Sequence, residues 1–230
     1  MALKPDQSGA FLASVAQVAD VAEVDDAAAG APGWTSRDQE ERRLIAGCVA
    51  GDPEAFRPLV MRYQRQAFAV ALRMLGSRSD AEDVAQQSFI DAFNALERFR
   101  DDGRPRAFST WLLRIVVNRS KDVLKSKRRT EQPLERDVAG GDAIFAHDPS
   151  DPEANASGGQ RRQRLEAALL AVPAKYREVL VLKDVEDLSY EEIRAILRLP
   201  ITTLKIRVVR ARAMLRTLLE PVPGKEGDLR

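Results

Sequence analysis

The sequence predicts an all-α protein in which a flexible acidic linker joins two small helical domains. Within 37–130 and 161–221, apolar residues recur at three- and four-residue spacing, and almost no stretch alternates like a strand. The intervening stretch 131–160 is rich in Pro, Gly and acidic residues, which is a linker composition. The length of 230 residues allows one large domain or two small ones.

Charge alternates in blocks along the chain, although the net charge is only +1. The first helical block, 37–130, has nineteen Lys and Arg against thirteen Asp and Glu, and 161–230 has fifteen against ten. The stretches 1–36 and 131–160 each have one basic residue, against five and seven acidic ones. This asymmetry describes the chain better than its net charge does.

The N-terminal extension of the chain has a composition that predicts disorder. The extension 1–36 is rich in Ala, Gly and Asp, with a weak helical pattern within 11–21, and 222–230 is a short polar tail. No signal-peptide core and no apolar run of about 18 residues is present, so we expect a cytoplasmic protein. The single Cys48 fits a reducing compartment and excludes an internal disulfide.

Helix-start signals divide the first helical block. Asp52 followed by Pro53 is suited to begin a helix, Gly76 ends it, and Ser79 or Asp80 is expected to begin the next. That next helix turns a polar face outward, which is either simply solvated or a surface for a partner. The residues of this face are Asp80, Asp83, Gln86, Gln87 and Asp91.

A third helix, within 108–129, gathers positive charge at its C-terminal end. Asn118 and Asp122 are one turn apart on one face. Favourable helix-dipole placement accounts for one or two basic residues there, but not for five within nine positions. With Phe99 in the preceding loop, this basic ridge suits single-stranded nucleic acid, whose bases stack and whose phosphates meet cations.

The last block contains a helix-turn-helix pattern. Ser189 and Glu192 form a capping box, and Pro200 breaks the helix that follows. The next helix buries one apolar face and exposes basic residues with hardly any acid, as expected for the major groove of DNA. A basic amphipathic helix that binds a membrane or a calmodulin-like partner is the alternative.

Three stretches resemble the extracytoplasmic-function (ECF) group of bacterial RNA polymerase sigma factors. They are "SDAEDVAQQSFIDAF" (79–93), "FSTWLLRIVVNRSKDVLK" (108–125) and "LSYEEIRAILRLPITTLKIRVVRARAML" (188–215). The resemblance implies sigma domain 2 at 37–130 and sigma domain 4 at 161–221, and it leaves no room for the central domain of housekeeping sigma factors. It implies core RNA polymerase and promoter DNA as partners, and an anti-sigma factor.

The resemblance also implies a role for individual residues. Core polymerase binding falls to Asp80, Glu82, Asp83, Gln86 and Gln87. The residues implied to contact the minus-ten element are Phe99, Asn118, Lys121, Asp122, Lys125 and Arg128. Among them, Asn118 holds a base that is flipped out of the DNA. Contact with the minus-thirty-five element falls to Thr202, Thr203, Lys205, Ile206, Arg207, Val209 and Arg210.

The chain departs from the family pattern at the turn and on the last helix. Arg198 stands where the turn usually has Gly, and Thr202 and Thr203 replace a Gly-Thr pair. Ile206 and Val209 replace frequent Ser and aromatic or His residues, and their apolar side chains suggest contact with thymine methyl groups. The promoter sequence therefore does not follow by analogy.

Two other functions compete with this interpretation. A one-component regulator would use only the C-terminal helix-turn-helix, which leaves the Asp83 face and Asn118 unexplained. An enzyme would need catalytic groups, but neither helical block has a His, a Gly-rich phosphate loop or a metal-ligand cluster, and Asp101 fits a turn. We therefore expect no catalytic residue, no metal, no cofactor, no small-molecule substrate and no membrane insertion.

Overall fold

The computed structural model describes residues 36–101, 103, 106–130 and 152–220, and every regular element within them is helical. The weak helix predicted within 11–21 and most of the predicted linker lie outside these residues. In chain order the elements are α2 (Ser36–Val49), η1 (Pro53–Phe56), α3 (Arg57–Leu75), α4 (Arg78–Asn94), η2 (Leu96–Arg98), α5 (Ala107–Thr130), α6 (Pro152–Ala171), α7 (Ala174–Leu180), the π-helical turn η3 (Val181–Val185), α8 (Tyr190–Leu197) and α9 (Ile201–Leu219). The all-α class is confirmed.

Local chemistry explains where the first helices begin and end. The Asp52 carboxylate accepts a hydrogen bond at 3.0 Å from a backbone N–H of η1, as predicted. Gly76 ends α3 in the left-handed conformation, with φ at 73°. Helix α4 begins earlier than predicted, because Ser77 is its N-cap and accepts from the Asp80 N–H at 3.4 Å.

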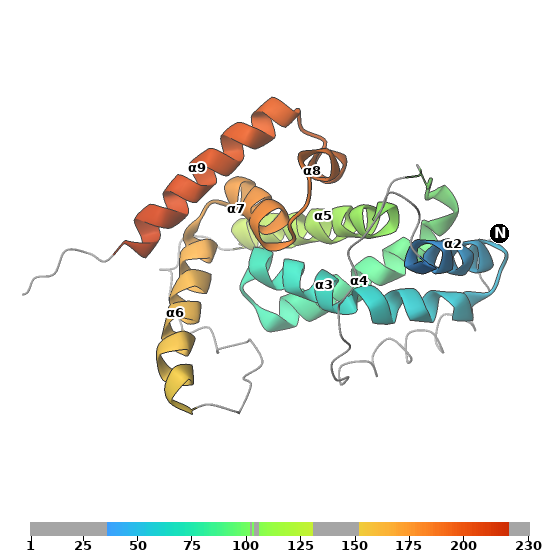
Figure 1. The fold of residues 1–230 in the computed structure, drawn as a ribbon, viewed down its shortest axis with the longest axis horizontal. Helices are drawn as coiled ribbons and strands as arrows, with labels where there is room; N and C mark the ends of the chain where they lie inside the picture. Colours follow the sequence, from blue (N-terminus) through green and yellow to red (C-terminus); the bar gives the residue numbers. More distant parts are fainter. Residues whose placement is uncertain (1–35, 102, 104–105, 131–151, 221–230) are drawn as a thin grey trace, which may run out of the picture.

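Helices α3, α4 and α5 pack on one another and form, with α2, the N-terminal helical unit (α2–α5; Figure 1). Its core contains fully buried Phe56, Phe89 and Phe108. The Phe56 ring meets the rings of Phe89 and Phe93 edge-on, at centroid distances of 6.5 and 5.1 Å. Helix α2, which we did not predict, joins α3 through Glu41, whose carboxylate accepts from the Tyr63 hydroxyl.

Helices α6–α9 form the C-terminal helical unit, with the predicted helix-turn-helix at its end. The capping box is confirmed: the Ser189 N–H donates to Glu192 Oε2 at 2.7 Å, and the Glu192 N–H donates to Ser189 Oγ at 3.2 Å. Arg198 caps α8 with φ at 55°, and α9 begins directly after Pro200. Helix α6 begins at Pro152, inside the stretch 131–160 whose composition predicts a linker.

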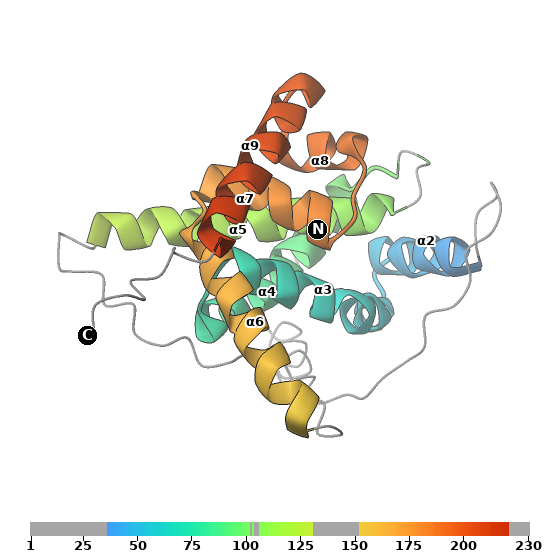
Figure 2. The ribbon, with the colours of Figure 1, turned by 60° about the vertical axis from the view of Figure 1, so that its left-hand side comes forward.

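The two helical units also pack against each other, which the sequence did not predict. Figure 2 shows α7 beside α3 and α5, and α8 lies over α5. Buried apolar residues of both units therefore form one continuous cluster. Asn118 and Lys205 are nevertheless both exposed, so the closed packing leaves these two predicted contact residues outside the common core.

Candidate nucleic-acid interfaces

The polar face predicted on α4 is present, and part of it is already paired. Glu82 and Asp83 are exposed, whereas Asp80, Gln86 and Gln87 are half-buried. Glu82 accepts from Arg78 Nε at 2.7 Å, one turn away. Asp83 has no ion pair within the described residues, so its carboxylate is available to another molecule.

Asp80 connects this face to the basic end of α5. Its carboxylate accepts from Lys127 Nζ, and its backbone N–H donates to Ser77 Oγ at 3.4 Å. Burial opposes ionisation of Asp80, but the hydrogen bonds from Lys127 and Ser77 outweigh it, and the pKa of this carboxyl is lowered. Asp80 therefore stays charged and positions the end of α5 as well as facing outward.

The predicted minus-ten residues of α5 lie along one exposed stripe. Asn118, Asp122, Lys125 and Arg128 are exposed, and their spacing of three or four residues places them on neighbouring turns. Lys121 is half-exposed, and its Nζ is 3.3 Å from Glu178 Oε2 in α7. The stripe therefore combines an amide, cations and one carboxylate on a single rigid helix.

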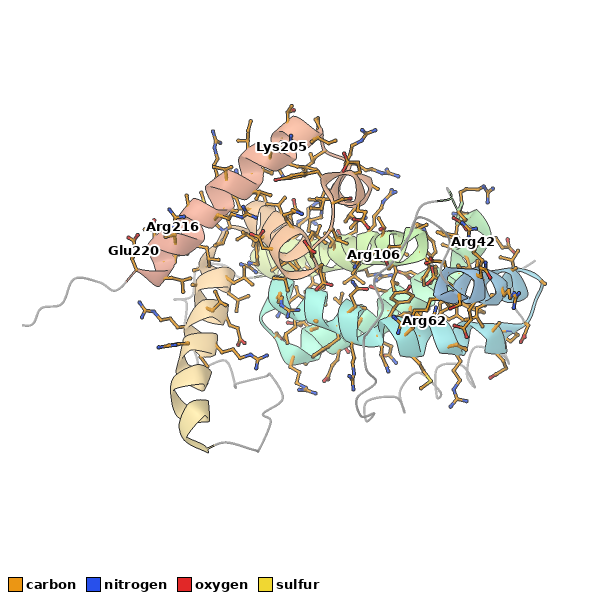
Figure 3. All side chains as sticks on the ribbon, in the orientation of Figure 1. Arg42, Arg62, Arg106, Lys205, Arg216 and Glu220 are labelled. Carbon is orange, nitrogen blue, oxygen red and sulfur yellow. The ribbon has the colours of Figure 1, made fainter. Side chains whose placement is uncertain are left out.

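Phe99 lies beside the start of α5 in an aromatic cluster. Its half-buried ring meets that of Phe108 edge-on, with centroids 5.8 Å apart, and that of Trp111 at 5.3 Å. Asp101 then accepts from the Gly103 N–H at 2.9 Å and pairs with Arg42 of α2. The unpredicted helix α2 thus anchors the loop that follows Phe99, in the region where Figure 3 labels Arg42.

The predicted minus-thirty-five residues occupy the outward side of α9. Ile206 and Val209 are 53% and 68% exposed, which is high for branched apolar side chains. Lys205 lies near the N-terminal end of α9, away from α3 and α5 (Figure 3), and its Nζ is 5.8 Å from the centre of the Tyr190 ring. The complete face is Thr202, Thr203, Lys205, Ile206, Val209 and Arg210, of which only Thr203 is half-buried.

Arg207 is the member of the predicted set that faces the protein. Its Nη1 is 3.1 Å from Glu178 Oε1 and 3.5 Å from the Lys175 carbonyl oxygen. Further along α9, Arg212 makes a two-point contact with Asp184 of η3. These pairs hold α9 against α7 and η3, so Arg207 both supports the helix and is a candidate DNA contact.

Sequence reasoning missed two charged residues between the helical units. Arg177 and Glu178 of α7 are both buried, at 8% and 4% exposure. Burial lowers the pKa of Arg177 to about 10 and raises that of Glu178, although Lys121 and Arg207 oppose the rise for Glu178. The only signal in the sequence is their position within the apolar run "YREVLVL", where most neighbours are core residues.

No group of His, Cys, Asp and Glu side chains within the described residues could hold a metal ion. Across the same part of the chain, none of the helices combines the length and the apolar character that a bilayer span needs.

Two family models match the chain, one on each helical unit. Residues 59–130 match Sigma-70 region 2, and residues 162–215 match Sigma-70, region 4. The first match covers α3–α5, and the second covers most of the C-terminal helical unit.

Curated relatives match over nearly their whole length. RNA polymerase sigma-H factor of Pseudomonas aeruginosa is 32% identical over 190 residues, which are 80% of this chain and 96% of the relative. ECF RNA polymerase sigma factor SigW of Bacillus subtilis is 35% identical, with 77% and 96% covered. ECF RNA polymerase sigma-E factor of Escherichia coli is also 35% identical, with 78% and 94% covered.

Two solved structures share the fold. CnrH in complex with the cytosolic domain of CnrY is 30% identical, with a TM-score of 0.55 and coverage of 78% of this chain and 97% of that one. The sigma factor RpoE, in complex with the anti-sigma factor NepR from Bartonella quintana, has a TM-score of 0.54 at 24% identity, covering 71% and 96%.

Proposed function

We propose roles for the surfaces of this chain, which belongs to the extracytoplasmic-function sigma factors of bacterial RNA polymerase. As a sigma factor, it binds core RNA polymerase and directs the enzyme to promoters. The α4 face binds the core enzyme in this proposal, with Asp83 as the central contact because its carboxylate is exposed and has no ion pair within the described residues. Its other members are Asp80, Glu82, Gln86 and Gln87.

The α5 stripe contacts and melts the minus-ten element. Flipping a base out of a duplex costs a few kcal/mol, which hydrogen bonds and stacking must recover. Exposed Asn118 offers both a donor and an acceptor to the flipped base, and the Phe99 ring is close to Trp111 and Phe108 in a cluster that can support stacking. Asp122 orients neighbouring polar groups, and Lys121, Lys125 and Arg128 bind phosphates.

The outward side of α9 enters the major groove at the minus-thirty-five element. Lys205 and Arg210 contact phosphates or guanine, and Ile206 and Val209 contact thymine methyl groups. Thr202 and Thr203 lie at the N-terminal turn, where hydroxyl and backbone N–H groups can donate to phosphate. Arg207 joins them once its contact with Glu178 is released.

The domains follow from these roles. Sigma domain 2 spans 37–130, sigma domain 4 spans 161–221, and 131–160 tethers them, with an extension at 1–36 and a tail at 222–230. The chain acts by binding alone, without catalysis, and the proposed role requires it to be cytoplasmic. Since the CnrH and RpoE structures contain CnrY and the anti-sigma factor NepR, we also infer that an anti-sigma factor binds this chain.

The observation that carries this proposal is the display of two basic surfaces, on α5 and on α9, in one chain that matches both sigma regions. The decisive experiment is run-off transcription with purified core polymerase and a library of genomic promoters. We expect initiation at a subset of promoters that share two sequence elements. Core polymerase that initiates equally with and without the chain would contradict the proposal.

A one-component regulator would use α9 without core polymerase, and a core-polymerase pull-down tests this difference. We expect the combined change Asp83→Ala and Gln87→Ala to weaken core binding at least tenfold and to leave DNA binding by α9 unchanged. The exposed Glu54→Ala, on η1, is the matched control and should bind core polymerase normally. A regulator would bind DNA tightly as an isolated chain and would not retain core polymerase at all.

A further inference from the structure

One buried carboxylate lies between the two helices that are proposed to bind DNA. Glu178 Oε2 is 3.3 Å from Lys121 Nζ of α5, and Glu178 Oε1 is 3.1 Å from Arg207 Nη1 of α9. Both cations belong to the proposed DNA-contact sets, one for each promoter element. A phosphate on either side must therefore compete with Glu178 for its cation.

The neighbouring Arg177 joins the same two helical units through their helix ends. Its guanidinium donates to the carbonyl oxygens of Met74 in α3, Leu170 in α6, and Val172, the last at 3.1 and 3.2 Å. The last carbonyls of a helix lack partners within it, so one fork satisfies acceptors from α3 and α6 together. No carboxylate pairs with Arg177 within the described residues, and its contacts are with backbone oxygens.

Side-chain packing and a hydrogen bond also join the two helical units. The Leu170 side chain packs on Gly76 so closely that an added Cβ at Gly76 would come within 2.6 Å of it. At the rim, Gln66 Nε2 donates to Glu186 Oε2 at 2.9 Å. Contact between the units is thus partly polar, as is usual for domains that move relative to one another.

The closed arrangement cannot contact both promoter elements at once. The minus-ten and minus-thirty-five elements are about 25 base pairs apart, which is roughly 85 Å of B-form DNA at 3.4 Å per base pair. Lys121 and Arg207 contact the same carboxylate, so they are only a few ångströms from each other. The units must separate before α5 and α9 can each reach their element.

We propose that Arg177 and Glu178 form an interdomain clasp that closes the free protein and blocks promoter binding. The clasp competes with DNA for Lys121 and Arg207, and binding to core polymerase and promoter opens it. Opening separates Lys121 from Glu178 and exposes Glu178 to water. A phosphate can then displace Glu178 from Arg207, whose contact with it lies within the C-terminal helical unit. This inference rests on the proposed function, because it takes Lys121 and Arg207 to be DNA contacts.

Distance measurements between spin labels test the clasp without polymerase or DNA. Labels at cysteines that replace exposed Arg98 and Arg216, with Cys48→Ser, report the separation of the two helical units in the full chain. We expect one narrow distance distribution for the wild type. Glu178→Gln keeps the shape of the side chain but removes its charge, and it should move at least half of the molecules to longer distances.

Two further variants keep this test decisive. Arg177→Lys retains the charge but loses the planar fork, and it should also lengthen the distances, which covers the case in which Glu178→Gln fails to fold by circular dichroism. Glu54→Gln makes the same change of net charge far from α7 and should leave the distances unchanged. Distances that stay at the wild-type value in both Glu178→Gln and Arg177→Lys would overturn the clasp.

A fluorescein-labelled 20-base-pair duplex without promoter sequence provides the second measurement. Releasing Lys121 and Arg207 should raise the affinity of Glu178→Gln at least fivefold and steepen its salt dependence by one to two counterions. Equal gains for Glu178→Gln and Glu54→Gln would show an effect of net charge alone and would refute the clasp. Failure of run-off transcription, with the distance shift intact, would instead refute the proposed function.

Discussion

Helices α5 and α9 each present a basic surface, but their surroundings differ. Helix α5 packs against α3, α4 and α8, and aromatic rings support its N-terminal end. Helix α9 rests on α6, α7 and α8 and leaves Ile206 and Val209 largely exposed. Helix α5, packed beside aromatic rings, is suited to bind an unpaired base. Helix α9, with its exposed apolar side chains, is suited to bind the groove of an intact duplex. In the proposed function, one chain divides strand separation and duplex recognition between two differently supported helices.

The aromatic support of α5 should have the largest effect on stability. Phe108→Ala removes a fully buried ring between Tyr63, Phe99 and Trp111, so we expect the free energy of unfolding to fall by about 3–5 kcal/mol. Urea unfolding followed by circular dichroism measures the change. Val209→Ala on the open face of α9 is the control and should stay within about 0.5 kcal/mol. Similar losses for both variants would remove the distinction between the two helices.

The amide on the α5 stripe should dominate promoter melting. Asn118→Ala loses the hydrogen bonds to a flipped base, which we expect to cost about 1–3 kcal/mol, or roughly 5- to 150-fold in run-off transcription. Lys125→Ala, two turns further along the same stripe of α5, should weaken promoter binding equally at all sequences and lower the salt dependence by about one counterion. Transcription by Asn118→Ala at the Lys125→Ala level would contradict a specific role for the amide.

The apolar tips of α9 predict a preference for thymine methyl groups. Replacing thymine by uracil in the minus-thirty-five element removes only the methyl group, which should cost the wild type about 0.8 kcal/mol, or roughly fourfold in affinity. The combined change Ile206→Ser and Val209→Ser should bind the thymine and uracil promoters equally well. If this variant still prefers thymine, the methyl contact lies elsewhere on the face.

The turn before α9 offers the smallest effect. Arg198 has φ at 55°, a left-handed conformation that costs a residue with a Cβ about 1–2 kcal/mol. Arg198→Gly removes this cost but adds flexibility to the unfolded chain, so we expect a net gain of about 0.5–1 kcal/mol in the free energy of unfolding. A higher melting temperature in thermal unfolding, with unchanged affinity for the nonspecific duplex, would confirm this prediction. A lower melting temperature would contradict it.

Local patterns in the sequence predicted most of the helices and the exposure of many site residues. The capping box at Ser189 and the break at Pro200 depend on neighbouring residues, and both are present as predicted. The start of α4 was misplaced, because Ser77 and Ser79 are both good caps and only the left-handed Gly76 decides between them. The roles of individual site residues remain predictions.

The contact between the helical units could not be predicted in the same way. Arg177 and Glu178 look like ordinary polar positions of a short helix, and their partners are distant in sequence or are backbone oxygens. Helix α2 was missed because its apolar residues, Leu44, Ile45 and Cys48, are few among many charges. Burial at such positions comes from tertiary packing rather than from local pattern.

The indole of Trp111 in the aromatic cluster gives this protein a built-in optical reporter. The chain has two tryptophans, and the other one, Trp34, can be replaced by Phe. All indole emission then comes from Trp111, whose ring lies beside that of Phe99. A nucleobase that stacks there would quench that emission. In a stopped-flow experiment, the loss of emission would occur either within the dead time of the instrument or in a later, resolved phase. Strand opening could then be timed without attaching a dye to protein or DNA.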